Sequence, residues 1–172
     1  IRQGKYEQGL ALNRSAVALY EAIGSQTEAV EALYDLGRLY LALGDSASAE
    51  DSFQRSMTTA RAIGLSRGIT SNLLALGDLQ MRRQDLEAAD AFYRQAWQRA
   101  REAGEMLSAA DGLLRLSAVH REQARYDEAQ QEAQQARDIA TELGAIYAVA
   151  EAAYALGEIS RLQGSSAAAI EQ

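Results

Sequence analysis

The chain is a tandem repeat with a period of 40 residues. Four glycines are spaced by that interval: Gly24, Gly64, Gly104 and Gly144. A second mark has the same period: Leu36-Gly37, Leu76-Gly77, Leu116-Ser117 and Leu156-Gly157. Periods between about 20 and 50 residues are typical of solenoids and arrays, in which each unit buries its apolar face only against its neighbours. This period predicts an array of small units rather than one globular core.

The apolar residues within one period are spaced for helices. Val30, Leu33, Leu36 and Tyr40 follow one another at steps of three or four, and the chain contains no proline. We therefore expect an all-α protein in which each repeat is an antiparallel helix pair. The expected helices are 5–23, 26–43, 46–63, 66–83, 86–103, 107–123, 126–143 and 146–163.

Small residues and caps mark the ends and contacts of these helices. Gly24 can end a helix in the left-handed conformation, and Ser25 with Glu28 has the spacing of a capping box for the next helix. The small residue at 37 or 77 is expected to lie against Ala49 or Ala89 of the second helix, which would let the two backbones approach closely.

The formal charge of the chain excludes several kinds of partner. Net charge is −7 at pH 7, and no basic stripe is present, so nucleic acid and anionic membrane are not expected partners. No apolar stretch approaches the ~20 residues of a membrane span, and the beginning does not read as a signal peptide. We expect a cytoplasmic, soluble chain. It contains no cysteine, which excludes disulfides and thiolate zinc sites.

The repeat motif resembles that of the tetratricopeptide repeat family. The family's first-helix pattern W-x-x-L-G-x-x-Y is present as Leu33, Leu36, Gly37 and Tyr40, followed on the second helix by Ala49, Phe53 and Ser56. The family's standard unit is about 34 residues, whereas the repeats here have a period of 40 residues. They are similar to those of kinesin light chains and of bacterial signalling proteins. The resemblance implies a right-handed superhelical solenoid whose first helices line a concave groove.

The resemblance also implies which residues face that groove. No Lys or Asn stands among these positions, which excludes the carboxylate clamp of the chaperone-binding members. Apolar side chains between charges suit an amphipathic partner, a protein or peptide. The alternative is that these are solvated positions facing another part of the same polypeptide. The predicted groove residues are Glu31, Tyr34, Asp35, Arg38, Leu41, Ser71, Leu74, Asp78, Met81, Arg82, Asp111, Leu114, Arg115, Arg121, Glu151, Tyr154, Glu158 and Arg161.

No catalytic constellation is evident in the sequence. The single histidine, His120, occupies the apolar position that Tyr40 holds in the first repeat, so it is predicted to serve packing. The single tryptophan, Trp97, is likewise predicted to pack between repeats. We therefore expect neither an enzyme nor a metal or other cofactor.

We interpret residues 1–172 as a single solenoid, a fragment of a longer chain. It comprises a leading helix at 5–23, repeats at 26–63, 66–103 and 107–143, and an incomplete repeat at 146–172 in which 166–172 would begin a second helix. The exposed ends, with Leu10, Val17 and Leu19 on one side and 167–170 on the other, suggest end-to-end self-association.

Two functions fit such an array. The first is a protein–protein interaction scaffold that binds a peptide or partner domain in the groove, as a module of a larger regulatory protein. The second is an effector- or peptide-sensing domain that controls an attached catalytic or DNA-binding domain. A deep closed pocket around Tyr34, Arg38, Leu74 and Asp78 would favour the sensor, and an open groove would favour the scaffold.

Overall fold

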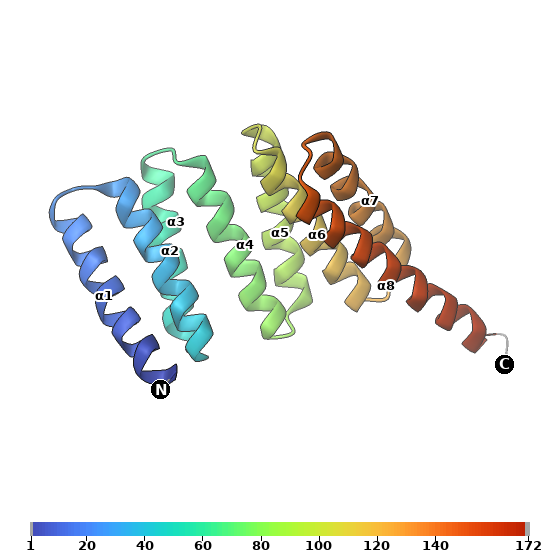
Figure 1. Ribbon diagram of the computed structural model, residues 1–172, viewed down its shortest axis with the longest axis horizontal. Coiled ribbons are helices and arrows are strands. Elements are labelled where there is room, and N and C mark those ends of the chain that lie inside the picture. Colours follow the sequence, from blue (N-terminus) through green and yellow to red (C-terminus); the bar gives the residue numbers. More distant parts are fainter. Residues whose placement is uncertain (1, 171–172) are drawn as a thin grey trace. The chain divides into compact units, whose positions relative to one another are not determined.

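The protein consists of eight helices in a computed structural model that describes residues 2–170, with side chains described for residues 7–164. Residues 2–170 contain no strand, as the helical spacing predicts. The helices follow one another as in Figure 1: α1 (Arg2–Ala22), α2 (Gln26–Leu43), α3 (Ser46–Ala62), α4 (Ser66–Arg82), α5 (Leu86–Glu102), α6 (Met106–Glu122), α7 (Tyr126–Glu142) and α8 (Ile146–Ile170).

The chain divides into two compact units, Ile1–Leu79 and Gln80–Gln172. In the first unit, α2 packs against both α1 and α3. In the second unit, α6 packs against α5 and α7, and α7 packs against α8 (Figure 1). None of the described helices is long and apolar enough to cross a membrane.

Left-handed residues end the helices at the period read from the sequence. Gly24, Gly64, Gly104 and Gly144 all have φ between +65° and +72°. At each of these turns the next N–H donates to a carbonyl five residues earlier, as Leu65 does to Ala60 at 2.8 Å. This hydrogen bond satisfies a carbonyl that the end of the helix leaves without a partner, so the repeated glycine is explained by the turn.

The last helix differs from the prediction. A second helix was expected to begin at 166, but α8 continues without a break through Gly164 to Ile170. Once a helix is nucleated, each further residue adds a hydrogen bond, and the alanines at 167–169 have high helix propensity. These factors outweigh the single glycine at 164, although Gly44 at the equivalent position of the first repeat ends α2 with φ +81°.

In the first repeat the nearest neighbour of Gly37 is Phe53. An added Cβ would stand 2.5 Å from Phe53 Cε1, and the predicted contact with Ala49 stays a prediction. Phe53 is fully buried, and its ring centroid lies 5.7 Å from that of Tyr34. Gly37 therefore makes room for an aromatic ring of the second helix, which the sequence pattern alone did not identify.

In the second unit, too, small residues lie where two helices come close together. A Cβ on Gly112 of α6 would stand 3.2 Å from the backbone nitrogen of Trp97 in α5. Ser117, at the position of Gly37, donates its hydroxyl to the carbonyl of Ala129 in α7 at 2.7 Å. Trp97 packs against a cluster of Ala110, Leu113 and Ala136. Its predicted role in packing between repeats is confirmed.

The expected capping box at α2 does not form. Ser25 is the N-cap residue, but its hydroxyl makes no hydrogen bond to the backbone of the helix. Instead it donates to the Glu28 carboxylate at 2.7 Å, and this hydrogen bond lowers the pKa of Glu28.

The leading helix is partly covered. Val17 is buried, Leu10 is half-buried and Leu19 is exposed, so only part of the proposed stacking face is free on this side. The opposite face, at 167–170, lies outside the residues whose side chains are described. End-to-end self-association therefore stays a prediction.

We predict opposite effects from adding one methyl group at two equivalent glycines. Gly37→Ala should reduce the free energy of unfolding by about 1–2 kcal/mol, because overpacking against buried Phe53 costs more than the gain in helix propensity. At Gly157 nothing lies within 4 Å of the added Cβ. Gly157→Ala should therefore increase the free energy of unfolding by up to about 1 kcal/mol. Urea denaturation of both variants checks this, and equal effects would contradict the assigned contact.

Candidate functional site

In the first unit, four predicted groove residues come together at one depression. Glu31, Tyr34, Asp35 and Ser71 line a space of about 320 Å³ between α2 and α4. Tyr34 is half-buried, and Arg38 lies over its ring with Cζ 5.9 Å from the ring centroid. The depression therefore has one aromatic wall and two acidic side chains at its rim.

A hydrogen-bonded chain of buried polar groups lies at the wall of this depression. The Ser56 hydroxyl donates to the carbonyl of Val30 at 2.7 Å and accepts a hydrogen bond from Asn72 Nδ2 at 2.8 Å. The same Asn72 nitrogen donates to the carbonyl of Gly68 at 2.8 Å. These bonds join α2, α3 and α4, so they fix the spacing of the two helices that border the depression.

In the second unit, four other predicted residues line a larger groove. Asp111, Leu114, Arg115 and Glu151 border a space of about 720 Å³ between α6 and the start of α8. Arg115 Nε donates to Asp111 Oδ1 at 2.9 Å, so these two charges neutralise each other. Glu151 has no ion-pair partner among the residues that the structure describes, which leaves this groove with a net negative charge.

The same groove exposes apolar side chains that the sequence analysis did not select. Leu107 is 54% exposed, Ile146 79% and Tyr147 90%, and all three line the groove. A signal was present in the sequence: the equivalent positions of the first two repeats hold Gln26, Thr27, Ser66 and Arg67, which are polar. The repeat pattern therefore does not explain why these exposed positions are apolar in the later repeats.

One face of α8 extends this surface. Tyr147, Glu151, Tyr154 and Glu158 follow at steps of four, three and four, which places them on one side of a helix. Tyr154 is 71% exposed. Arg161 donates to Glu158 at 2.9 Å and lowers the pKa of that carboxyl. The face thus alternates exposed aromatic rings with carboxylates.

The remaining predicted residues do not join either site. Leu74 is buried and is not among the residues that line either groove. Leu41 and Met81 are half-buried, Arg82 is exposed, and Arg121 pairs with its neighbour Glu122 at 3.2 Å.

The pocket that would favour a sensor is not formed as expected. Of its four proposed residues only Tyr34 lines the first-unit depression, whereas Arg38, Leu74 and Asp78 are not among the lining residues. The depression is open to solvent.

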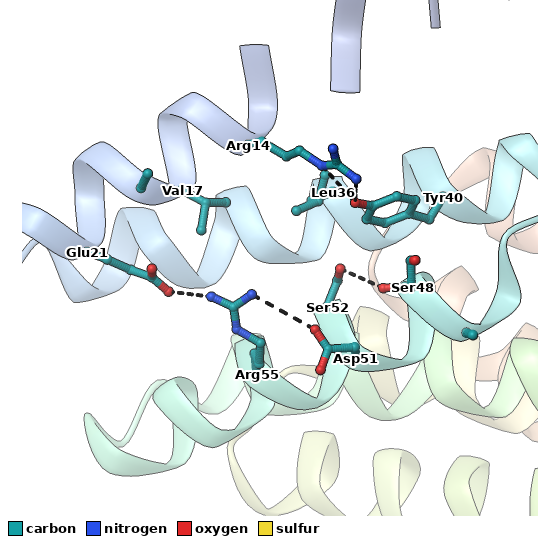
Figure 2. A pocket seen from close by; sticks show the side chains of 11 residues that line it. Arg14, Val17, Glu21, Leu36, Tyr40, Ser48, Asp51, Ser52 and Arg55 are labelled. Carbon is teal, nitrogen blue, oxygen red and sulfur yellow. Dashed lines mark hydrogen bonds and ion pairs between the residues drawn. The ribbon is translucent and has the colours of Figure 1, made fainter. Parts of the chain in front are cut away.

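A further pocket of about 470 Å³ lies between α1, α2 and α3 (Figure 2). Arg14 donates from Nε to the Tyr40 hydroxyl at 2.9 Å, and Arg55 pairs with Glu21 at 2.8 Å and with Asp51 at 3.9 Å. Arg14 therefore joins α1 to α2, and Arg55 joins α3 to α1. The pocket lies along the contact between these three helices.

The single histidine occupies a buried polar cluster in the second unit. His120 is 1% exposed, as its predicted packing role requires. Its Nδ1 lies 2.7 Å from Glu132 Oε2 on α7, and its Nε2 lies 3.0 Å from Asp90 Oδ1 on α5. Arg94 also donates to Asp90 at 3.0 Å. Among the described residues no group of His, Cys, Asp and Glu could hold a metal ion.

Comparison with known families agrees with the repeat pattern. Residues 1–62 match the family model described as Tetratricopeptide repeat. Over these residues the chain is similar to tetratricopeptide repeats. No curated protein matches the chain in sequence.

Solved structures share the fold of this chain. Aspartyl phosphate phosphatase F from Bacillus subtilis is 15% identical with a TM-score of 0.86, over 99% of this chain and 44% of that one. The STAND protein with a tetratricopeptide repeat sensor from Pyrococcus horikoshii is 18% identical with a TM-score of 0.77, over 92% and 25%. The kinesin light chain TPR-like repeats from Podosopora anserina are 16% identical with a TM-score of 0.65, over 95% and 84%.

These similarities show the fold alone. The chain spans less than half of the phosphatase and a quarter of the STAND protein. What those whole proteins do is therefore separate from what this array of repeats does.

We predict that the buried hydroxyl of Ser56 stabilises the first unit. Ser56→Ala removes the partner of both Val30 and Asn72 in a dry environment and should lower the free energy of unfolding by about 1–3 kcal/mol. The control is Thr58→Ala, since Thr58 is exposed and bonds only within its own helix. That change should stay within about 0.5 kcal/mol. Urea denaturation monitored by circular dichroism measures both, and an equally small loss in the two variants would contradict the assignment.

Proposed function

We propose that this chain is a protein-interaction module that binds a partner segment in the groove between α6 and α8. The observation that supports this most directly is the exposure of Leu107, Ile146 and Tyr147 around one groove. Exposed apolar groups that cluster beside polar ones are typical of interaction sites, and tyrosine is enriched among residues that contribute most to binding.

The partner that we propose has a large apolar side chain next to a basic one. Glu151 lies between Tyr147 and Tyr154 on α8, while the charge of Asp111 is already balanced by Arg115. A lysine or arginine of the partner would therefore meet an unbalanced carboxylate beside the aromatic rings. An amphipathic helix laid along the groove would present both kinds of side chain at steps of three and four.

The module would act without catalysis or a cofactor, as part of a larger regulatory protein in the cytoplasm. We also propose that the two units continue a single array over residues 1–172. Neither nucleic acid nor a membrane is a proposed partner, because the chain carries a net charge of −7. The sensor alternative is less favoured, because the depression beside Tyr34 is open.

Selection of peptides from a random display library tests the proposal. Peptides that bind the chain should share an apolar residue flanked by Lys or Arg. A variant with Tyr147→Ala and Tyr154→Ala should bind them at least about tenfold more weakly, since removing two exposed rings from a binding site costs more than about 1.4 kcal/mol.

The matched control carries Leu12→Ala and Leu19→Ala, which remove two exposed apolar side chains from α1. It should bind the selected peptides as the parent chain does. Selected peptides that bind all three proteins equally would refute the α6–α8 groove as the site.

A further inference from the structure

The hydrogen bonds around His120 determine which atoms of the cluster carry protons. Asp90 Oδ1 accepts from Arg94 at 3.0 Å, so Asp90 is held as a carboxylate. His120 Nε2, at 3.0 Å from the same oxygen, must then be the N–H donor. The remaining proton lies between His120 Nδ1 and Glu132 Oε2, which are 2.7 Å apart.

Loss of this proton would place two acceptors opposite each other. A neutral imidazole has one N–H, which Asp90 already takes, so its Nδ1 lone pair would face an ionised Glu132 carboxylate. Both groups are shielded from water: His120 is 1% exposed and the Glu132 side chain 15% exposed. An unpaired buried acceptor costs the full penalty of desolvation, so the pair is stable only when it holds the proton.

Other charged groups around the cluster do not replace this proton. On α5, Arg94 forms three hydrogen bonds with Asp90 at 3.0–3.3 Å. At the start of α7, Arg125 pairs with Glu128, and this partner raises the pKa of Arg125. Each of these cations is therefore already bound to another carboxylate, and the proton is the charge that balances Glu132.

We propose that Asp90, His120 and Glu132 form a proton-dependent clasp that holds α5, α6 and α7 together and loosens when its shared proton is lost. The three residues come from three different helices, so the clasp acts between repeats rather than within one helix. The second unit becomes sensitive to pH through a group that lies outside the α6–α8 groove.

The direction of the pH effect follows from the burial of Glu132. Burial raises the pKa of Glu132, and its hydrogen bond to His120 only partly opposes that rise. A carboxyl whose pKa is higher in the folded than in the unfolded state contributes stability at low pH and loses it as pH rises through the folded value. The second unit should therefore lose stability as pH rises above the ordinary range of a glutamate.

Thermal unfolding of the whole chain followed by Trp97 fluorescence tests the clasp. Trp97 is the only tryptophan and lies in the second unit, so its signal reports this unit. Relative to Glu132→Gln, the midpoint of the parent chain should fall by more than about 4 °C as pH rises above 4.5, the ordinary value for a glutamate. In Glu132→Gln the new amide can donate to a neutral Nδ1, so this variant should lack that loss.

The matched control is Glu142→Gln, which makes the same substitution on the same helix at an exposed position. It should retain the pH dependence of the parent chain. Parallel pH profiles for the parent and Glu132→Gln would overturn the proposal, as would a flat profile for the parent.

A second measurement on the unmodified chain does not depend on any variant folding. Because His120 is the only histidine, its two ring nitrogens give unambiguous NMR signals. Loss of the shared proton changes the hydrogen bond made by Nδ1, so the Nδ1 signal should shift over the pH range in which the Trp97 midpoint falls. An Nδ1 signal that stays constant throughout that fall would contradict the clasp.

Discussion

Close approach between neighbouring helices holds each of the two units together. A helix pair alone cannot cover its apolar face, so each pair needs the neighbouring repeat. Small residues make that approach possible: Gly37 accommodates the ring of Phe53, and Gly112 meets the backbone of Trp97. Where a serine replaces the glycine, as at Ser117, its hydroxyl bonds to the carbonyl of Ala129 in the facing helix.

Because packing uses the repeated positions, the positions that vary between repeats are available for function. The second and third residues after each turn glycine are polar in the first two repeats and apolar in the last two, where Leu107, Ile146 and Tyr147 are exposed. Likewise, the position of Tyr40 is taken by His120, which places an imidazole between the carboxylates of Glu132 and Asp90. Each departure from the repeat changes the chemistry of the second unit without changing its helices.

The period and its residues predicted the fold well. The turn glycines, the helix pairs and the burial of His120 all follow from spacing. The course of α8 beyond Gly164 did not, since the same residue type ends α2 at Gly44. A glycine permits a left-handed turn but does not require one, and local helix propensity decides the outcome.

The sites were predicted less completely, for two physical reasons. Family positions identified Asp111, Leu114, Arg115 and Glu151 correctly as neighbours, because first helices of adjacent repeats stand side by side. They placed Leu74 in an open groove although it is buried, since exposure depends on the bulk of side chains around it. The clasp could not be read from spacing, because its three members lie on three helices and 42 residues separate the outer two.

The central claim is that the groove between α6 and α8 is the binding surface. Amide hydrogen exchange of the chain, with and without a display-selected peptide, tests it most directly because protection is read along the whole backbone. We predict slower exchange within residues 106–115 and 146–158 when the peptide is bound, and no change within 26–62. Protection confined to 26–62, with 106–115 and 146–158 unchanged, would contradict the account.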